Sequence, residues 1–337
     1  SKKEIYKDPK ADIESRVEDL LSRMTLEEKI AQLAGHGLAT DSNARLGIPG
    51  LLMSDGPIGV RTGKATVFPA GVAMGASFDT ILVKKVAKAI ATELKAKGLN
   101  MILGPCMDLQ RFPAGGRNFE TYSEDPFLNG TYASNYIRAA QEEGVIACAK
   151  HFACENIQWE RFKLNQNVEE RALREIFFPP FEKSVKEGNV LSVMASYYKI
   201  NGISATENAF FLNEVLKKEW GFEGFVVSDW DATHSTIQAA NNGLDVEMPQ
   251  PVYFGDSLLA AVRAKAVSEE VINDKVRRVL RAKFKAGLFD TKYVPNDALV
   301  NSQAHKDLAK EVAIAGMVLL KNKNQILPLD RSKIKSI

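Results

Sequence analysis

Asp229 and Trp230 stand just behind the apolar run 225–227, with a single serine between. Such a run is typical of a strand buried on both faces, and a parallel sheet presents the last residues of such strands to a ligand. At that place a carboxylate can attack an electrophile, take up a proton or accept hydrogen bonds from hydroxyls. An indole adds a flat apolar face. The pair predicts a site if other strands deliver polar groups to the same end.

Four further apolar runs carry polar residues at their carboxyl ends or in the loop that follows. The polar residues are Asp55 at the end of run 51–55, Arg117 in the loop after run 100–105, Lys150 and His151 near the end of run 145–152, and Tyr197 near the end of run 190–198. In a parallel barrel these strand ends converge on one mouth. Carboxylates accept from hydroxyls, cations donate to them and an aromatic face stacks on C–H groups. The set therefore suits a neutral polyhydroxylated ligand.

Each of these residues also has an ordinary structural interpretation. Asp55 can cap the turn before Gly-Pro, Arg117 can pair with Glu120 or Glu124 on a solvated loop, and Tyr197 can pack in a core. A lysine inside an apolar run, such as Lys150, needs a partner or a cavity. If these residues had no shared function, all of the ordinary interpretations would have to hold together at the same end of one sheet. A shared site is the simpler explanation.

The elements that must position these residues alternate along the chain. Helical patterns occupy residues 80–97, 130–143, 169–186 and 208–218, between the apolar runs, and a further strand candidate lies at 243–248. Strand and helix in alternation, with strands of the buried type, predict an α/β fold with a parallel sheet covered by helices. We expect a (β/α)8 TIM-like barrel, complete or irregular, in preference to an open sheet. Residues 13–33 are expected to be helical, with Thr25 and Glu28 as a capping box in the middle.

The last part of the chain changes character. We expect residues 1–300 to form the barrel, and 301–337 to form a helix at 302–316 followed by a linker. That linker contains a strand-like apolar piece at 317–320 and is expected to lead toward an α/β domain outside this sequence.

Composition excludes several classes of partner. The formal charge of +2 and the mixing of both signs along 337 residues give no reason to expect nucleic acid or an anionic membrane as partner. No stretch approaches the ~20 apolar residues of a membrane span, and the first residues lack the apolar core of a signal peptide. The basic run 275–285 is interpreted as the solvated back of a helix.

Metal and cofactor chemistry are not expected either. The three cysteines, Cys106, Cys148 and Cys154, form no CxxC pair and are expected to be small buried residues. No HExxH motif or EF-hand loop is present. The sequence therefore predicts carboxylate chemistry without a metal or cofactor.

Seven segments together resemble the barrel domain of glycoside hydrolase family 3. They are SDGPIGVR, GGRNFETYSEDP, KHFA, VEERALREIFFPPFEKSVK, VMASYYKING, EWGFEGFVVSDWDA and NGLDVEMP, and they follow in the family's order and spacing. The match runs from about Arg16 to Leu329. Several independent motifs agree, which makes the resemblance more specific than a single short motif would be.

The resemblance implies a retaining β-glycosidase of the β-glucosidase type acting on β-linked glucosides or oligosaccharides. Asp229 would be the nucleophile that forms a covalent glycosyl-enzyme, with a pKa kept low by neighbouring cations. Trp230 would form a wall of the sugar subsite. Glu247 matches an acidic position with a supporting role, and Arg161 falls near a family arginine. The shell around the sugar hydroxyls would consist of Asp55, Arg117, Lys150, His151 and Tyr197.

The resemblance leaves the general acid unassigned. A retaining enzyme needs a second carboxyl group about 5 Å from the nucleophile. In many relatives it comes from a following α/β domain, and the loop after Lys150 lacks the His-Asp pair used by single-domain relatives. We therefore expect the acid to come from a companion domain or a second chain, with Glu155 or Glu160 as the candidates within this sequence.

Two other functions remain open from the sequence. One is a sugar-binding barrel without useful turnover, which differs from the glycosidase only in lacking the acid. The other is a Schiff-base aldolase that uses Lys150 beside His151 at a barrel strand end. An aldolase reaction would give Asp229 and the loop 115–126 no role.

Overall fold

A computed structural model describes residues 4–291 and 293–336 of the chain. A five-stranded parallel sheet forms its centre, in the order β10-β7-β5-β4-β3. All five strands coincide with predicted apolar runs, which confirms the predicted parallel α/β arrangement. They are β3 (Met53–Asp55), β4 (Met101–Leu103), β5 (Ile146–Phe152), β7 (Ser192–Ala195) and β10 (Phe225–Ser228).

The sheet closes into an irregular barrel through two further segments. The predicted strand 243–248 forms bridges only: Val246 pairs in parallel with Val227, and Glu247 pairs with Ala34. The hairpin of β1 (Gly35–His36) and β2 (Ala39–Thr40) then returns to β3, where Ala39 pairs antiparallel with Leu52. The predicted TIM-like barrel is thus present, with an antiparallel step where β2 meets β3.

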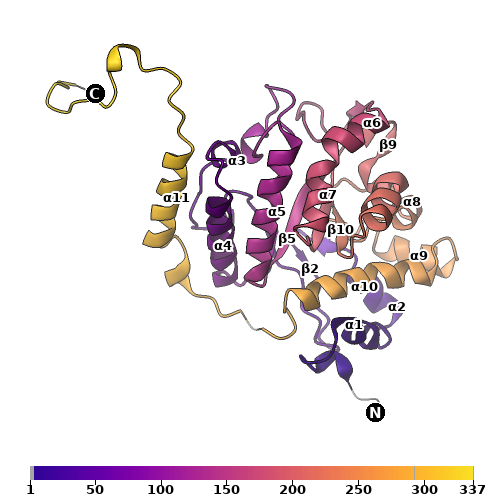
Figure 1. The fold of residues 1–337 in the computed structure, drawn as a ribbon. Helices are drawn as coiled ribbons and strands as arrows, with labels where there is room; N and C mark the ends of the chain where they lie inside the picture. Colours follow the sequence, from indigo (N-terminus) through magenta and orange to yellow (C-terminus); the bar gives the residue numbers. More distant parts are fainter. Residues whose placement is uncertain (1–3, 292, 337) are drawn as a thin grey trace.

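Helices cover the outside of the barrel (Figure 1). The helices α4 (Thr80–Ala96), α5 (Pro126–Glu142) and α7 (Pro179–Lys186), which follow β3, β4 and β5, pack side by side. The helix α10 (Glu269–Lys285) crosses close to the amino-terminal helices α1 (Ile13–Leu21) and α2 (Leu26–Ala31). The α-helices are α1 (Ile13–Leu21), α2 (Leu26–Ala31), α3 (Gly71–Gly75), α4 (Thr80–Ala96), α5 (Pro126–Glu142), α6 (Glu170–Ala172), α7 (Pro179–Lys186), α8 (Ile237–Asn241), α9 (Asp256–Arg263), α10 (Glu269–Lys285) and α11 (Gln303–Ala315).

Shorter elements fill the connections. The π-helices η3 (Leu173–Phe177) and η5 (Phe210–Glu219) precede α7 and β10, and a small sheet contains β6 (Asn165–Gln166), β8 (Lys199–Ile200) and β9 (Ile203–Ser204). The 3-10 turns are η1 (Ile5–Lys7), η2 (Asn118–Glu120), η4 (Ala205–Glu207), η6 (Asp297–Leu299) and η7 (Lys323–Gln325). Within the described residues no helix combines the length and apolarity that a bilayer crossing requires.

Two predicted helices are interrupted. The capping box expected at Thr25 and Glu28 is confirmed, and it starts the separate helix α2, so the helix expected over residues 13–33 is divided in two. The expected helix over 169–186 divides into α6, η3 and α7. Its last part begins at Pro179, whose missing N–H suits the first turn of a helix.

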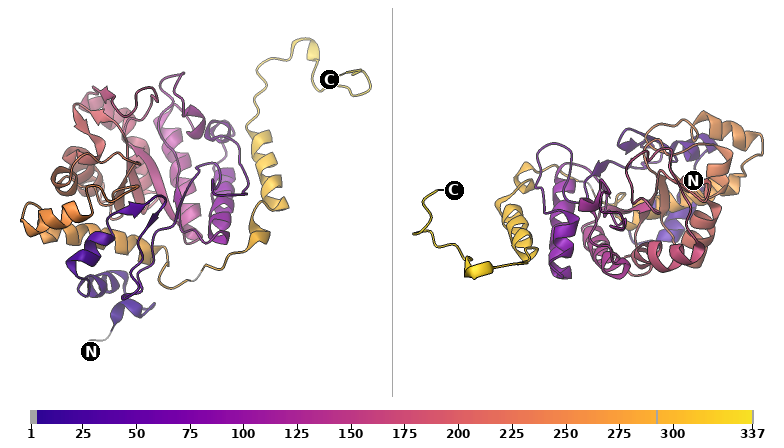
Figure 2. Two further views of the ribbon diagram at one scale, coloured as in Figure 1. Left: turned by 180° about the vertical axis from the view of Figure 1, so that it is seen from behind. Right: turned by 90° about the horizontal axis from the view of Figure 1, so that it is seen from above.

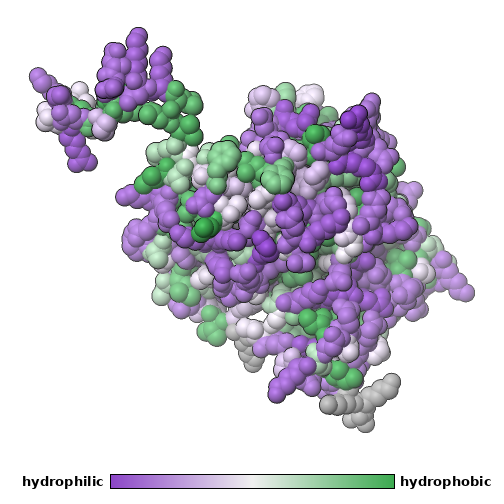
Figure 3. Space-filling model, viewed as in Figure 1, coloured by the Kyte–Doolittle hydropathy of each residue, from purple (hydrophilic) through white to green (hydrophobic). Residues whose placement is uncertain are grey.

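The chain after α11 leaves the barrel as an extended segment (Figures 1 and 2). The helix predicted at 302–316 is confirmed as α11, which packs against α3 and α4. The strand expected at 317–320 is wrong, because these residues are highly exposed and pair with no described strand. Figure 3 shows their apolar side chains where the segment leaves the body. The domain boundary at 300 and the linker role stay predictions, and Ile337 lies outside the described residues.

The basic run 275–285 is only partly solvated, which corrects its interpretation as a helix back. Lys275 and Lys283 are buried on α10, and the Lys283 ammonium donates to the Gln32 side chain at 2.7 Å. Position 283 follows Val279 by four residues and Leu280 by three, so it belongs to the apolar face. Helix periodicity predicts this burial, and the charge run concealed it. The three cysteines are free and buried, as predicted.

Lys283→Met is expected to flatten the rise of stability with pH. Burial lowers the pKa of Lys283 from its ordinary 10.5 to about 7. Between those values the unfolded chain holds a proton that the folded chain lacks, so stability rises by about 1.4 kcal/mol per pH unit. Urea unfolding between pH 7 and 10 measures the slope. Lys285→Met, on the exposed side of α10, is the control; an unchanged slope in Lys283→Met would contradict the prediction.

Candidate active site

The carboxyl ends of the parallel strands open on one cavity of about 420 Å³. Asp55 ends β3, Lys150 and His151 lie on β5, and Asp229 follows β10. The structure brings all but one of the sequence-predicted site residues into this cavity. Its lining consists of Leu38, Asp55, Arg61, Leu103, Arg117, Glu120, Lys150, His151, Arg161, Met194, Tyr197, Asp229 and Trp230.

Lys150 and Asp55 form an ion pair in the cavity. The Lys150 ammonium, 3% exposed, lies 2.5 Å from Asp55 Oδ1, and Arg61 binds Asp55 Oδ2 at 2.8 Å. Burial acts to raise the pKa of Asp55, but Lys150 and then Arg61 hold it below its ordinary value. Asp55 also accepts from the Gly56 N–H, so it caps its turn as well. The pair presents one cation and one anion to hydroxyl groups.

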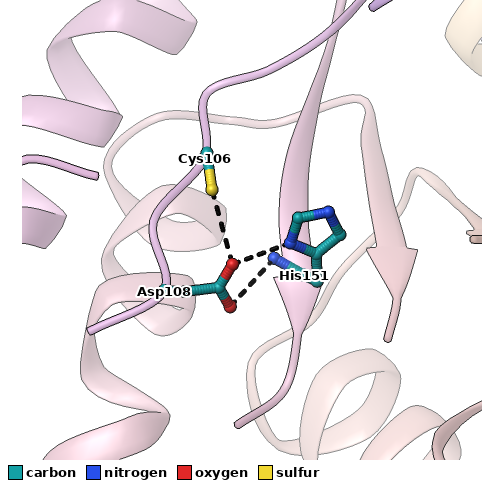
Figure 4. Close-up of side chains that lie close together, drawn as sticks. All are labelled: Cys106, Asp108 and His151. Atoms are coloured by element: carbon teal, nitrogen blue, oxygen red, sulfur yellow. Dashed lines mark hydrogen bonds and ion pairs between the residues drawn. The ribbon is translucent and has the colours of Figure 1, made fainter. Parts of the chain in front are cut away.

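A chain of hydrogen bonds fixes the orientation of His151. Arg117 Nη1 lies 3.0 Å from His151 Nε2, and His151 Nδ1 lies 2.7 Å from Asp108 Oδ2, as Figure 4 shows for the Asp108 side. A guanidinium only donates, so Nε2 must accept and Nδ1–H must donate to Asp108. Burial, followed by Arg117 and Lys150, lowers the pKa of His151 well below its ordinary value. His151 is therefore a neutral imidazole of fixed tautomer.

Arg117 is also held from the other side, by Glu120. The carboxylate of Glu120 receives two hydrogen bonds from Arg117, at 3.0 and 2.8 Å. The pairing that would make Arg117 an ordinary loop residue therefore exists, and Arg117 still lines the cavity.

Asp229 presents a carboxylate oxygen without a hydrogen bond from any described residue. Its Oδ1 accepts from the Trp230 N–H at 2.7 Å, whereas Oδ2 is buried without a partner and lies 3.6 Å from His151 Nε2. Burial raises the pKa of Asp229, and Lys150, the Trp230 N–H and Tyr197 only partly oppose this. The expected low pKa is thus wrong, since Lys150 and Arg117 are committed to Asp55 and Glu120.

Aromatic side chains form one wall of the cavity. The Trp230 indole N–H donates to the Gly37 carbonyl at 2.9 Å, which joins the β10 end to the β1–β2 hairpin. The Arg161 guanidinium lies 4.5 Å from the centre of the Tyr197 ring, and Phe162 meets that ring edge-on at 4.7 Å. These contacts hold Tyr197 and Trp230 just beyond the carboxyl ends of the neighbouring parallel strands β7 and β10.

Glu247 is the predicted site residue that the structure does not bring into the cavity. Its carboxylate accepts from the backbone N–H groups of Tyr253 and Phe254, at 2.9 and 2.6 Å. Its backbone pairs with Leu33 and Gly35. Glu247 therefore fixes a loop and the barrel closure.

Sequence reasoning missed Arg61, Asp108 and Glu120. Arg61 lies within SDGPIGVR and Glu120 within GGRNFE, so both were inside quoted motifs. Asp108 follows β4 in a stretch without a strand or helix pattern. A carboxylate a few residues beyond a buried strand was the available signal.

Two groups of ligand-type atoms in the described residues have metal-like spacing, and both contain His151. One adds Cys106 and Asp108, the other adds Glu155 and Asp229, and the atoms of each group lie within 4.8 Å of one another. The Arg117 guanidinium donates to His151 Nε2, so the nitrogen that would bind a cation is already occupied by a charged donor. The arrangement fits hydroxyl binding with one reactive carboxylate better than metal coordination.

The chain is similar to proteins named as β-glucosidases. A family model described as the glycosyl hydrolase family 3 N terminal domain matches residues 20–282. Beta-glucosidase B of Emericella nidulans is 42% identical over 324 residues, which cover 94% of this chain and 38% of that relative. Thermostable beta-glucosidase B of Acetivibrio thermocellus is 39% identical over 331 residues, with coverages of 94% and 43%.

Solved structures show the same barrel. Beta-glucosidase 3B from Thermotoga neapolitana in complex with glucose superimposes with a TM-score of 0.88 at 35% identity, covering 93% of this chain and 48% of that chain. The Beta-D-glucoside glucohydrolase from Trichoderma reesei gives 0.90 at 34% identity, with coverages of 96% and 48%. The chain spans less than half the length of each of these relatives.

Proposed function

Because the chain belongs to glycosyl hydrolase family 3, we propose that its barrel hydrolyses terminal β-linked glucosyl residues by a retaining mechanism. The observation that carries the proposal is the buried Oδ2 of Asp229, which accepts no hydrogen bond from a described residue and belongs to a cavity-lining side chain. The carboxylate would attack the anomeric carbon and leave a covalent glycosyl-aspartate for water to hydrolyse. The names of the relatives support the glucosyl substrate.

The other cavity residues would bind the sugar. Lys150, Arg61 and Arg117 donate to hydroxyl oxygens, Asp55 accepts from hydroxyls, and neutral His151 offers no charge to repel the oxocarbenium-like transition state. Arg161, through its contact with the Tyr197 ring, would hold Tyr197 toward Asp229. The Trp230 face would stack on the C–H side of a ring.

The general acid is proposed to come from a companion domain or a second chain. Besides Asp229, the carboxylates that line the cavity are Asp55 and Glu120, and both are bound to cations. Glu155 has a fully buried side chain and does not line the cavity, while Glu160 is exposed and pairs with Lys163 at 3.3 Å. Neither is therefore placed to protonate a leaving group, and the greater length of the relatives supports an external donor.

An activated 2-deoxy-2-fluoro-β-glucoside tests the proposal, because its leaving group needs no proton. We expect one glycosyl adduct per chain in the intact mass, on the peptide that contains Asp229, with excess glucose slowing its formation. An unmodified chain at every pH, or an adduct elsewhere, would overturn the proposal.

The two other candidate functions gain less support. Lys150 is bound to Asp55, and although burial acts to lower its pKa, Asp55 raises it above the ordinary value. A Schiff base needs the free amine, so borohydride is not expected to trap a carbonyl compound on Lys150. A barrel that only binds sugar would bind glucose by calorimetry without forming the Asp229 adduct.

A further inference from the structure

Glu155 is a buried carboxyl group that the proposed reaction does not use. It lies in the loop after β5, with a side chain that is 0% exposed. Its Oε1 accepts from the Gln158 amide at 3.2 Å and lies 3.6 Å from Arg117 Nη1 and 3.8 Å from Arg161 Nη1. Its Oε2 is buried without a hydrogen bond from any described residue.

Glu155 and Asp229 face each other as two incompletely bonded carboxyl groups. One oxygen of each lies within 4.8 Å of the other, beside His151, and each group keeps one buried oxygen without a partner. Two carboxylates this close and this buried cannot both ionise at low cost. The nearest cations do not remove the difficulty, because Arg117 is shared with Glu120 and Arg161 lies against Tyr197. One carboxyl group therefore keeps its proton.

The contacts favour Glu155 as the protonated partner. Asp229 accepts a backbone hydrogen bond at Oδ1 and its side chain is 10% exposed, whereas Glu155 is completely enclosed. A proton on Glu155 also relieves the nearby carboxyl of Asp108, whose pKa is raised by burial and by Glu155. The ionisable groups that face Glu155, together with the Gln158 amide, are Asp108, Arg117, His151, Arg161, Tyr197, Tyr198 and Asp229.

We propose that Glu155 is a positioning residue for Asp229: in its neutral form it leaves Asp229 as the single charged carboxylate of the pair and leaves Arg117 on Glu120 and His151. This rests on the proposed function, in which Asp229 is the nucleophile. When Glu155 ionises, Asp229 keeps its own charge, but the new carboxylate, 3.6 Å from Arg117 Nη1, competes with Glu120 and His151 for that guanidinium. The arrangement of Arg117 and His151 that supports attack by Asp229 therefore ends where Glu155 loses its proton.

The pH dependence of Asp229 labelling isolates this effect. With an activated leaving group no general acid contributes, and Asp229 itself only becomes more ionised as the pH rises, so a fall in rate at high pH reports on the groups around Asp229. Burial, and then Asp229, raise the pKa of Glu155 to about 7. Above a midpoint near that pH, we expect the second-order rate of adduct formation in the wild-type chain to fall by about tenfold per pH unit.

Glu155→Gln is expected to abolish this fall, so that labelling stays on its plateau to pH 9. Glu160→Gln, in the same loop but exposed, is the matched control and is expected to keep the wild-type profile. A falling limb that persists in Glu155→Gln, or a flat wild-type profile, would overturn the inference alone. No adduct in the wild-type chain at any pH would overturn the proposed function, and the inference with it.

Glu155→Asp keeps the test decisive if the glutamine variant does not fold. The shorter aspartate side chain places its carboxyl group farther from Asp229. The fall of the labelling rate at high pH should therefore remain, with its midpoint at a lower pH. A midpoint identical to wild type would show that the limb does not come from residue 155 and would overturn the inference. Glucose affinity by calorimetry establishes that each variant retains the cavity.

Discussion

Asp229→Gly is expected to remove the burst of nitrophenolate that the proposed mechanism predicts for the wild-type chain with an activated aryl β-glucoside. The loss of glycosylation rate should be on the order of 10⁴-fold, the scale seen when one member of a catalytic group is deleted. The reason is that the other carboxylates of the cavity are held by cations, Asp55 by Lys150 and Arg61 and Glu120 by Arg117. Stopped-flow release of nitrophenolate, one equivalent per chain at most, measures the burst.

With azide added, the configuration of the product shows from which face the sugar is attacked. In Asp229→Gly the small anion can occupy the space of the missing carboxylate and attack from that face, so a β-glucoside should give the α-glucosyl azide. In the wild-type chain azide would attack the proposed glycosyl-aspartate from the opposite face and should give the β-glucosyl azide. The anomer, read by proton NMR, therefore identifies which group occupies the reactive face.

Asp231→Asn is the control for this pair of reactions. Asp231 is an exposed carboxylate two residues from Asp229, at a positive φ of 64° that asparagine also adopts. It should keep the burst and the β-azide product. A burst retained in Asp229→Gly, or the same azide anomer from both chains, would show that another group attacks the sugar.

The location of the candidate site was predictable because parallel strands share one polarity. The apolar runs before Asp55, Lys150 and Asp229 identify buried strands, and the carboxyl ends of such strands must meet. Their convergence on one cavity follows without knowledge of the loops. The fold class was predictable for the same reason.

The electrostatics of the site were not predictable, because they depend on which loops fold back. Asp108 and Glu155 lie outside any strand pattern, and only the packed structure places them against His151 and Asp229. Asp229 was expected to have a low pKa because cations stood near it in the sequence pattern. A pattern does not show that Lys150 and Arg117 already bind other carboxylates.

The closure of the barrel was equally inaccessible from periodicity. Residues 243–248 were only a strand candidate, and their pairing with both Ala34 and Val227 is a contact between distant parts of the chain. The hairpin β1–β2 has two residues in each arm, too few for an alternation pattern to be seen.

Asp245→Ala is expected to destabilise the barrel by about 3–5 kcal/mol, the cost of leaving buried charges without their partner. Asp245 is fully buried in this closing segment. Its Oδ1 lies 2.7 Å from the Lys217 ammonium and 3.7 Å from that of Lys275, and its Oδ2 accepts from the Val226 N–H at 2.7 Å. One carboxylate thus compensates two buried lysines and anchors β10 three residues before Asp229. The free energy of unfolding in urea measures the loss.

The loss of stability in Asp245→Ala is expected to become smaller as the pH rises. Burial lowers the pKa of both lysines, that of Lys275 to about 7, and Asp245 opposes the shift. Without Asp245 both pKa values fall further, so the folded chain holds fewer protons than the unfolded chain up to about pH 10.5. Stability of the variant should therefore rise with pH more steeply than that of the wild type, and the two should approach each other near pH 10.

Two further variants separate lost charge compensation from general disruption. Glu214→Ala removes an exposed carboxylate of η5 that binds Lys218 at 3.0 Å, and a surface pair of this kind is worth less than ~1 kcal/mol. The triple variant Lys217→Met, Asp245→Asn, Lys275→Met removes all three charges and keeps an acceptor for the Val226 N–H. It should recover most of the stability, since apolar replacement of a buried ion cluster is commonly neutral. Were the triple variant no more stable than Asp245→Ala, the carboxylate would act by packing rather than by compensating charge.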